Sequence, residues 1–169
     1  VYRRVNAATG FYRGVEGALV LGAFHGFSLW GNVTWMKGEV EDTDGETSPG
    51  SRVPPLMGSG GLRWEDDDLG LYAEVFTHWA MRQDQLAAED LKDLRICEDP
   101  NNPGLLLGED ACKGTPGWAT VNLRLGYTPM KSLNINLTAE NLTDEHYKYH
   151  GSGIYAPGFQ VLTTIQGTY

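Results

Sequence analysis

The sequence lacks several features, and each absence excludes a class of protein. No uninterrupted apolar run reaches about 18 residues, so a transmembrane helix is excluded. A basic surplus is missing as well: the 169 residues carry a net charge of −9, and nucleic-acid binding needs a basic face. Hydrophobic residues make up only 41%, which is low for a large soluble core. A membrane protein that crosses with strands remains allowed, because its charges can lie in loops and in its interior.

The chain begins at Val1, with neither an initiating Met nor a signal peptide. We therefore expect either a mature form or a fragment. One domain is the default for this length.

Alternation of apolar and polar residues is the dominant pattern. In the closing stretch, Leu133, Ile135 and Leu137 alternate with Asn134 and Asn136, which is the period of a β-strand. Val1–Asn6 resembles the end of a strand. The same pattern predicts seven further strands, over Phe11–Leu21, Phe27–Met36, Leu56–Glu65, Leu69–Arg82, Trp118–Tyr127, Leu133–Ala139 and Phe159–Tyr169.

The connections between these strands alternate in length. Those at 23–26, 66–68 and 128–132 are short, and those at 37–55, 83–117 and about 143–157 are long. An antiparallel meander with turns at one end and loops at the other produces this alternation. We therefore predict an all-β fold, an up-and-down meander of about seven to eight strands of a transmembrane β-barrel, with a short helix over Asp84–Leu94.

The two faces of the predicted strands differ in charge. A soluble β-sandwich would also alternate, but here aromatic residues stand on the apolar face near strand ends, where membrane proteins carry aromatic girdles. These are Trp35, Trp64, Trp79, Tyr127 and Tyr169. The opposite face is predicted to line a lumen through Glu16, Asn32, Arg63, Glu74, Asn122, Arg124, Asn136 and Glu140.

An ordered set of short motifs resembles one family. The segment Gly126–Tyr169 resembles the C-terminal end of TonB-dependent outer-membrane receptors. The matching pieces are, in order, Ala139-Glu140-Asn141-Leu142-Thr143-Asp144, Tyr147, His150-Gly151-Ser152-Gly153, and Pro157-Gly158 before a final strand that ends in an aromatic residue. Upstream, Gly14-Val15-Glu16 and Arg52-Val53-Pro54-Pro55 are similar to landmarks of the same family. The chain departs from it at Phe159, where the family usually has Arg.

The resemblance implies a fold and a function. Such receptors have a 22-stranded barrel with a plug, and residues 1–169 would be the C-terminal segment of the barrel, without the plug and the earlier strands. It would lie in the outer membrane of a Gram-negative bacterium and take part in active uptake of a scarce small-molecule ligand, such as an iron–siderophore or cobalamin. Its partners would be outer-membrane lipid and lipopolysaccharide, the barrel-assembly machinery, and TonB through the plug. Nucleic acid, a cofactor and catalysis are not expected.

Candidate site residues follow from the resemblance. Cys97 and Cys112 would face the oxidising cell surface, which favours a disulfide over a metal pair or two free thiols. His146, Tyr147, Tyr149 and His150 would lie in the last extracellular loop, either as ligand contacts or as residues that pack against the rim. No catalytic constellation and no metal site are predicted. Phe159, Val161, Ile165 and Tyr169 would form the barrel-assembly signal of the last strand.

Two other hypotheses remain. The chain could be a complete eight-stranded outer-membrane barrel, closed by pairing Val1–Asn6 with the last strand, which would act as an adhesin, a structural protein or an outer-membrane enzyme. It could also be a soluble β-sandwich that binds a partner, although the aromatic placement disfavours this.

Overall fold

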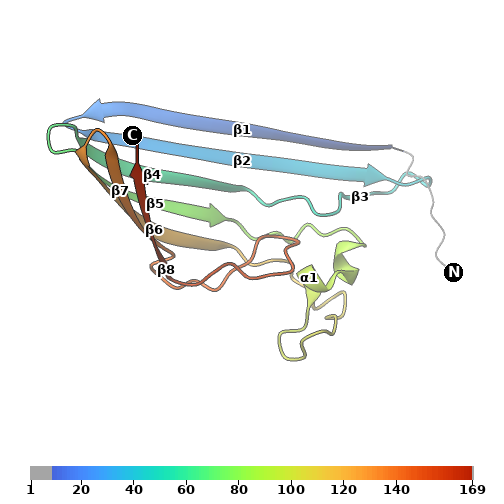
Figure 1. The fold of residues 1–169 in the computed structure, drawn as a ribbon. Coiled ribbons are helices and arrows are strands. Elements are labelled where there is room, and N and C mark those ends of the chain that lie inside the picture. The colour runs from blue at the N-terminus through green and yellow to red at the C-terminus, as the bar shows by residue number, and fades with distance from the viewer. Residues whose placement is uncertain (1–8, 169) are drawn as a thin grey trace.

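A single antiparallel sheet forms most of the protein (Figure 1). The computed structural model describes residues 9–168. The strands follow one another in the sheet in chain order, and the short strand β3 pairs with the far end of β2. The strands are β1 Thr9–Phe24, β2 Phe27–Glu41, β3 Thr47–Pro49, β4 Met57–Asp66, β5 Leu71–Ala80, β6 Trp118–Met130, β7 Leu133–Glu140 and β8 Gln160–Gly167.

Short turns lie at one end of this sheet and long loops at the other (Figure 1). The β1–β2 turn consists of His25 and Gly26, whose φ angles are 51° and 83°. Positive φ at both central residues is what a type I′ turn requires, and this turn matches the twist of the flanking strands. The long connections are residues 42–56, 81–117 and 141–159, so the predicted meander is confirmed.

The sheet does not close on itself within residues 9–168. β1 and β8 lie at opposite edges, and neither pairs with the other. The fold is therefore the partial barrel that the alternation predicts. The strand stub expected at Val1–Asn6 lies outside the described residues, as does Tyr169.

The strand register separates two faces. The outer face is defined by cross-strand rows such as Leu29, Leu62 and Val75, and the inner face by rows such as Arg63, Glu74 and Arg124. The outer face is apolar, and yet its side chains are exposed. The exposed residues include Val15, Leu19, Leu29, Val33, Leu62, Val75, Val121, Leu125, Leu137, Val161 and Ile165.

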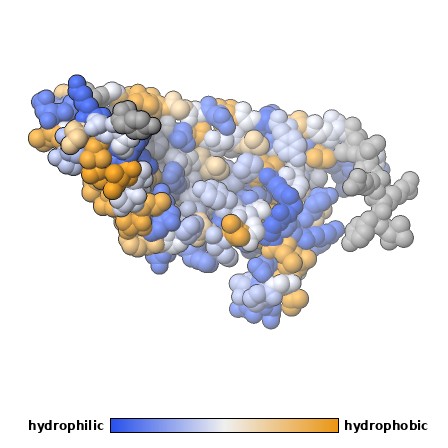
Figure 2. Space-filling model, viewed as in Figure 1, coloured by the Kyte–Doolittle hydropathy of each residue, from blue (hydrophilic) through white to orange (hydrophobic). Residues whose placement is uncertain are grey.

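Burial is inverted relative to a soluble protein. The inner face buries polar side chains such as Glu74 and Asn122, whereas the apolar outer face has no second layer against it in the described part of the chain. Figure 2 shows hydrophobic side chains gathered at the short-turn end over β7 and β8, and hydrophilic ones around the long loops. A soluble sandwich would bury its apolar face between two sheets, so the soluble hypothesis is not supported.

Aromatic rings lie across glycines of neighbouring strands on the inner face. Tyr72 is directly opposite Gly126, and Trp30 is directly opposite Gly61. A Cβ atom at Gly126 would overlap the Tyr72 ring, and one at Gly61 would lie 2.9 Å from Trp30 Nε1. These two glycines therefore provide the space in which large inner-face rings lie flat on the sheet.

Two sequence-based expectations about the loops are wrong. Residues 37–55 are not wholly irregular, because β2 continues to Glu41 and pairs with β3. The helix expected over Asp84–Leu94 is replaced by a 3₁₀ turn, η1, at Asp90–Lys92 and a single α-helical turn, α1, at Leu94–Cys97. The other strand ends differ from expectation by three residues or fewer. No helix in residues 9–168 has the length and apolarity needed to cross a membrane.

We predict that Gly126→Ala destabilises the folded protein by about 1–3 kcal/mol, because the added methyl group must displace the Tyr72 ring in a packed site. Urea denaturation in detergent micelles, followed by tryptophan fluorescence, measures this loss. Gly17→Ala is the matched control, since its Cβ would lie at an ordinary 3.7 Å from Val33. Equal losses in the two variants, or the same loss for Gly126→Ala in a Tyr72→Ala background, would contradict the account.

Candidate functional site on the inner face and in the long loops

A charged cluster occupies the middle of the inner face. The carboxylate of Glu74 is buried and accepts hydrogen bonds from Trp30 Nε1 at 2.7 Å and from Arg124 at 2.8 Å. The Arg124 guanidinium also lies 4.8 Å from the centre of the Phe76 ring. Both carboxylate oxygens are thus paired, which a buried carboxylate needs if it is to stay charged.

A second polar cluster lies closer to the short-turn end. The hydroxyl of Tyr72 donates a hydrogen bond to Asn136, whose amide in turn donates to Asn134. Arg63 lies over the Tyr72 ring at 4.1 Å. The two clusters cover neighbouring parts of the inner face, and each is hydrogen-bonded within itself.

The structure places the predicted polar residues on the inner face. The register puts Arg63, Glu74 and Arg124 in one row, and Asn122 opposite Phe76 in the next. The other residues predicted to line the lumen lie on the same face, namely Glu16, Asn32, Asn136 and Glu140. That the face lines a water-filled lumen stays a prediction.

Asn141 organises the last long loop. It is 3% exposed and has a φ angle of 51°, a conformation that Asn adopts more readily than most residues. Its backbone N–H donates to Asn122, and its side-chain amide donates to the carbonyl oxygens of Glu145 and Pro157. The side chain thereby joins the two ends of the loop, and the backbone N–H ties the residue to Asn122 on β6.

The start of β8 is fixed by the same motif. Asp144, which also has a φ angle of 51°, accepts a hydrogen bond from the backbone N–H of Phe159 at 2.8 Å. Phe159 stands where the family usually has Arg, and its own side chain is exposed. The backbone N–H therefore anchors the strand start to Asp144.

The four residues predicted to contact the ligand pack against different neighbours. Tyr147 stacks on Trp118 with 4.0 Å between ring centres, and Tyr149 packs edge-on against the same indole. His146 stacks on Tyr155 instead, also at 4.0 Å. Burial raises the pKa of Tyr147, and the neighbouring Tyr149 and Glu140 add to this effect, so the phenol stays protonated.

His150 does not join these aromatic residues. Its Nδ1 atom lies 2.9 Å from Thr115 Oγ1, and its Nε2 atom is buried without a hydrogen-bond partner among the described residues. Burial lowers the pKa of His150, and Asp90 and Asp93 oppose this shift, so the neutral imidazole is favoured.

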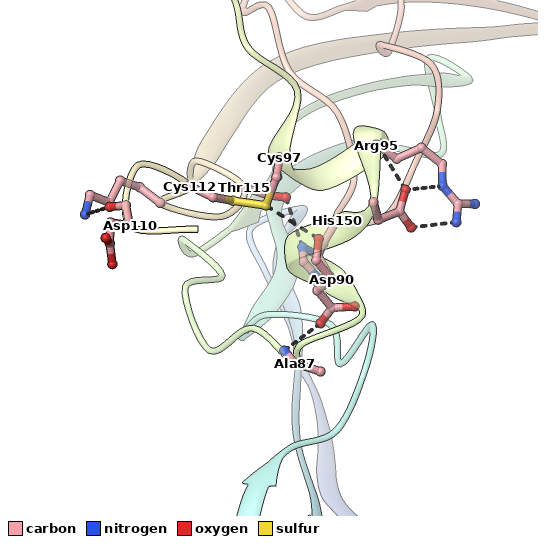
Figure 3. Close-up of a disulfide and its surroundings, with 10 residues drawn as sticks. Ala87, Asp90, Arg95, Cys97, Asp110, Cys112, Thr115 and His150 are labelled. Atoms are coloured by element: carbon pink, nitrogen blue, oxygen red, sulfur yellow. Dashed lines mark hydrogen bonds and ion pairs between the residues drawn. A yellow bond between two sulfur atoms is a disulfide. The ribbon is translucent and has the colours of Figure 1, made fainter. Parts of the chain in front are cut away.

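Cys97 and Cys112 form a disulfide, as predicted (Figure 3). Cys97 is fully buried in a small apolar cluster with Ile96 and Cys112, and three leucines, Leu86, Leu91 and Leu107, pack against it. Closing a loop of this size stabilises it by about 3 kcal/mol. The long loop at 81–117 therefore has a small stapled core of its own.

Asp90 attaches this stapled loop to the neighbouring one. Asp90 is 1% exposed, and its carboxylate accepts hydrogen bonds from Ser51 Oγ at 2.7 Å and from the Arg52 backbone N–H at 3.2 Å. It also accepts one from Ala87 N–H at 3.0 Å within its own loop (Figure 3). Gln83 adds a second link, because its side-chain amide donates to the Val53 carbonyl at 2.7 Å. The loops at 42–56 and 81–117 are thus joined through buried polar contacts.

Ion pairs reinforce the junction. The carboxylate of Asp93 binds Arg95 at 2.6 Å and Arg52 at 3.0 Å, and chiefly the hydrogen bonds from Arg95 hold the pKa of Asp93 well below its usual range. With the contact between Thr115 and His150, all three long loops form one connected assembly, which we call the loop assembly. The sequence gives no local signal for it, because the partners of Asp90 lie almost forty residues away.

Two of the four residues predicted to form a barrel-assembly signal lie on the last strand. Val161 and Ile165 are on the outer face and exposed, and Phe159 immediately precedes β8. The fourth predicted residue, Tyr169, lies outside the described residues. The role of these residues as a recognition signal stays a prediction.

An exposed apolar outer face combined with a polar, hydrogen-bonded inner face defines a segment of the wall of a membrane-spanning β-barrel. The family model described as TonB dependent receptor-like, beta-barrel matches residues 1–142, and the chain therefore belongs to this family. TonB-dependent receptors are Gram-negative outer-membrane proteins, and they act as transporters and not as enzymes.

Solved structures agree with the fold. Among 29 chains that match is the copper transporter OprC, with a TM-score of 0.72 and 14% sequence identity. The match covers 95% of this chain and 24% of OprC, so the chain spans about a quarter of that structure's length. At this identity the likeness concerns the fold alone. No curated protein matches the sequence.

We predict that Asp90→Ala releases the stapled loop from its neighbour, because the donors of Ser51, Arg52 and Ala87 lose their acceptor. Each buried donor left without an acceptor lowers the stability of the folded protein by about 1–3 kcal/mol. Hydrogen exchange should rise in residues 49–55 and 83–97. Asp99→Ala is the matched control, since its carboxylate bonds only within its own turn. Unchanged exchange in the Asp90 variant, or an equal rise in both, would show that Asp90 does not hold the loops together.

Proposed function

We propose that residues 1–169 form the C-terminal segment of the barrel of a TonB-dependent receptor that takes up a scarce ligand, such as an iron–siderophore or cobalamin. The observation that supports this most strongly is the family match over residues 1–142, on a sheet whose faces are inverted relative to a soluble protein. The plug domain and the remaining strands would come from other parts of the intact receptor.

In this proposal the two faces have different partners. The exposed outer face contacts outer-membrane lipid, and the loops above it contact lipopolysaccharide. The inner face contacts the plug, and its charged groups Glu74 and Arg124 are paired with each other there. Because these groups are already satisfied by one another, the plug can shift without leaving a buried charge unpaired.

Ligand capture is assigned to the extracellular end. The loop assembly joins the three long loops by buried contacts, so they present a common surface to the ligand. Tyr147 and Tyr149 belong to this surface, whereas His150 is enclosed at its base. TonB supplies the energy by acting on the plug, and the chain described here forms the wall against which the plug moves.

Assembly of the barrel requires a partner of its own. We propose that the barrel-assembly machinery reads the last strand through Phe159, Val161, Ile165 and Tyr169. The exposed outer-face positions of Val161 and Ile165 are compatible with such a signal.

The complete eight-stranded barrel is the weaker alternative. It needs a closing strand at Val1–Asn6, outside the described residues, and the sheet over residues 9–168 is open. A matching solved structure that is about four times as long favours a part of a larger barrel instead. Because that likeness concerns the fold, we do not extend the copper in the name of OprC to this chain.

Uptake measurements test the proposal. The receptor that carries this segment should be expressed in a Gram-negative strain and in its TonB-deficient derivative, and accumulation of radioactive cobalamin and of radioactive iron presented as ferric siderophores should be measured. We expect several-fold accumulation of one of these ligands that disappears without TonB, since transport against a gradient needs that energy source. Accumulation of neither ligand, or accumulation that persists without TonB, would contradict the proposed function.

A further inference from the structure

A cavity of about 400 Å³ opens on the inner face beneath the last long loop. Its walls include the rings of Tyr147, Tyr149 and Tyr155, and Ile154 stands at its edge with 79% of its surface exposed. This volume lies within the usual range for small-molecule sites, which combine apolar walls with a few polar groups. Tyr149 and Tyr155 are both about half exposed. Because His146 stacks on the Tyr155 ring and Lys148 Nζ lies 5.3 Å from its centre, Tyr149 is the ring that remains for a ligand cation.

Polar groups on β5, β6 and β7 line the cavity opposite these rings. His78 uses its Nδ1 atom to pair with Ser59 at 2.7 Å, which leaves Nε2 for another partner. The carboxylate of Glu140 accepts one hydrogen bond from Gln160 through Oε2, at 2.6 Å, and its Oε1 atom has no recorded partner among residues 9–168. Asn122 is 2% exposed, with its oxygen engaged by Asn141, so its contribution is structural.

The charge around the cavity has one sign. Glu140 is the only charged side chain among the described residues that line it, and no Lys or Arg does so. Lys148 lies over the Tyr155 ring at 5.3 Å and lines the adjoining cavity beside Trp118. In the loops at 37–55 and 83–117 acidic residues also outnumber basic ones, which agrees with the net charge of −9.

We propose that this cavity is a subsite for a cationic group of the transported ligand. The ring face of Tyr149 supplies the negative side of its quadrupole to the cation, as aromatic sites for organic ammonium groups do. The free carboxylate oxygen of Glu140 supplies the counter-charge. This inference rests on the proposed function, because it assigns a chemical class to the ligand of the same receptor.

An anionic ligand is disfavoured for two reasons. It would place a second negative charge next to Glu140 without a basic side chain to pair with it, and such juxtapositions weaken binding strongly. The Tyr149 ring face would repel it as well. The same arguments leave the acidic loops free to concentrate cations near the entrance, an effect that high salt weakens.

Three probes that share a benzene ring and differ in charge test the inference, namely benzyltrimethylammonium, benzyl alcohol and benzoate. Their binding to the intact receptor in detergent micelles should be measured by isothermal titration calorimetry at pH 7. We expect the ammonium probe to bind saturably and benzoate not to bind. Glu140→Gln and Tyr149→Leu should each weaken the ammonium probe by about fivefold, as loss of a partly exposed cation contact does, whereas Tyr149→Phe should retain its affinity.

Glu109→Gln is the matched control, because it removes the same charge from the stapled loop, at an exposed position away from the cavity. Benzoate binding as tightly as the ammonium probe, no saturable binding of the ammonium probe, or equal losses in Glu140→Gln and Glu109→Gln would overturn the inference. The proposed function is tested separately by the uptake measurement. If TonB-dependent uptake is observed but the ammonium probe does not bind, the cationic subsite is contradicted and the proposed function stands.

Discussion

Backbone hydrogen bonding between neighbouring strands is the constraint on which the rest of this structure depends. Lipid offers no partner to an N–H or C=O group, so each strand must satisfy its backbone through its neighbours. The continuous antiparallel ladder from β1 to β8 does this for every internal strand. Because side chains alternate along a strand, the same ladder fixes which residues meet lipid and which meet the interior.

Packing on the inner face follows from that register. Curvature brings inner-face side chains together, and they are accommodated by pairing large residues with small ones, as Tyr72 with Gly126 and Trp30 with Gly61. The Trp30 ring in turn donates to Glu74, which holds Arg124. Steric fit and charge pairing thus meet at Trp30, which packs over Gly61 and donates to Glu74.

Much of the sheet is predictable from the sequence, because alternation and turn residues are local signals. His25-Gly26 and the apolar periodicity of Leu133–Ala139 specify their structures within a few residues. The extension of β2 to Glu41 is not predictable in this way, since its acidic residues are typical of a loop and it is pairing with β1 on one side and β3 on the other that orders them. Asp90 is similar: its sequence context indicates a solvated surface, and its burial depends on Ser51 and Arg52, which are distant in the chain.

The central claim is that the apolar outer face meets lipid while the inner face meets water, and accessibility of nitroxide labels at Asn32 and Val33 tests it most directly. These neighbours in β2 lie on opposite faces. The labels are measured in the intact receptor reconstituted in lipid bilayers. Oxygen concentrates in lipid, so it should relax the label at position 33 more strongly than the label at position 32. A water-soluble nickel chelate should instead relax the label at position 32 more strongly. Equal accessibility at the two positions, or the reverse order, would contradict the account.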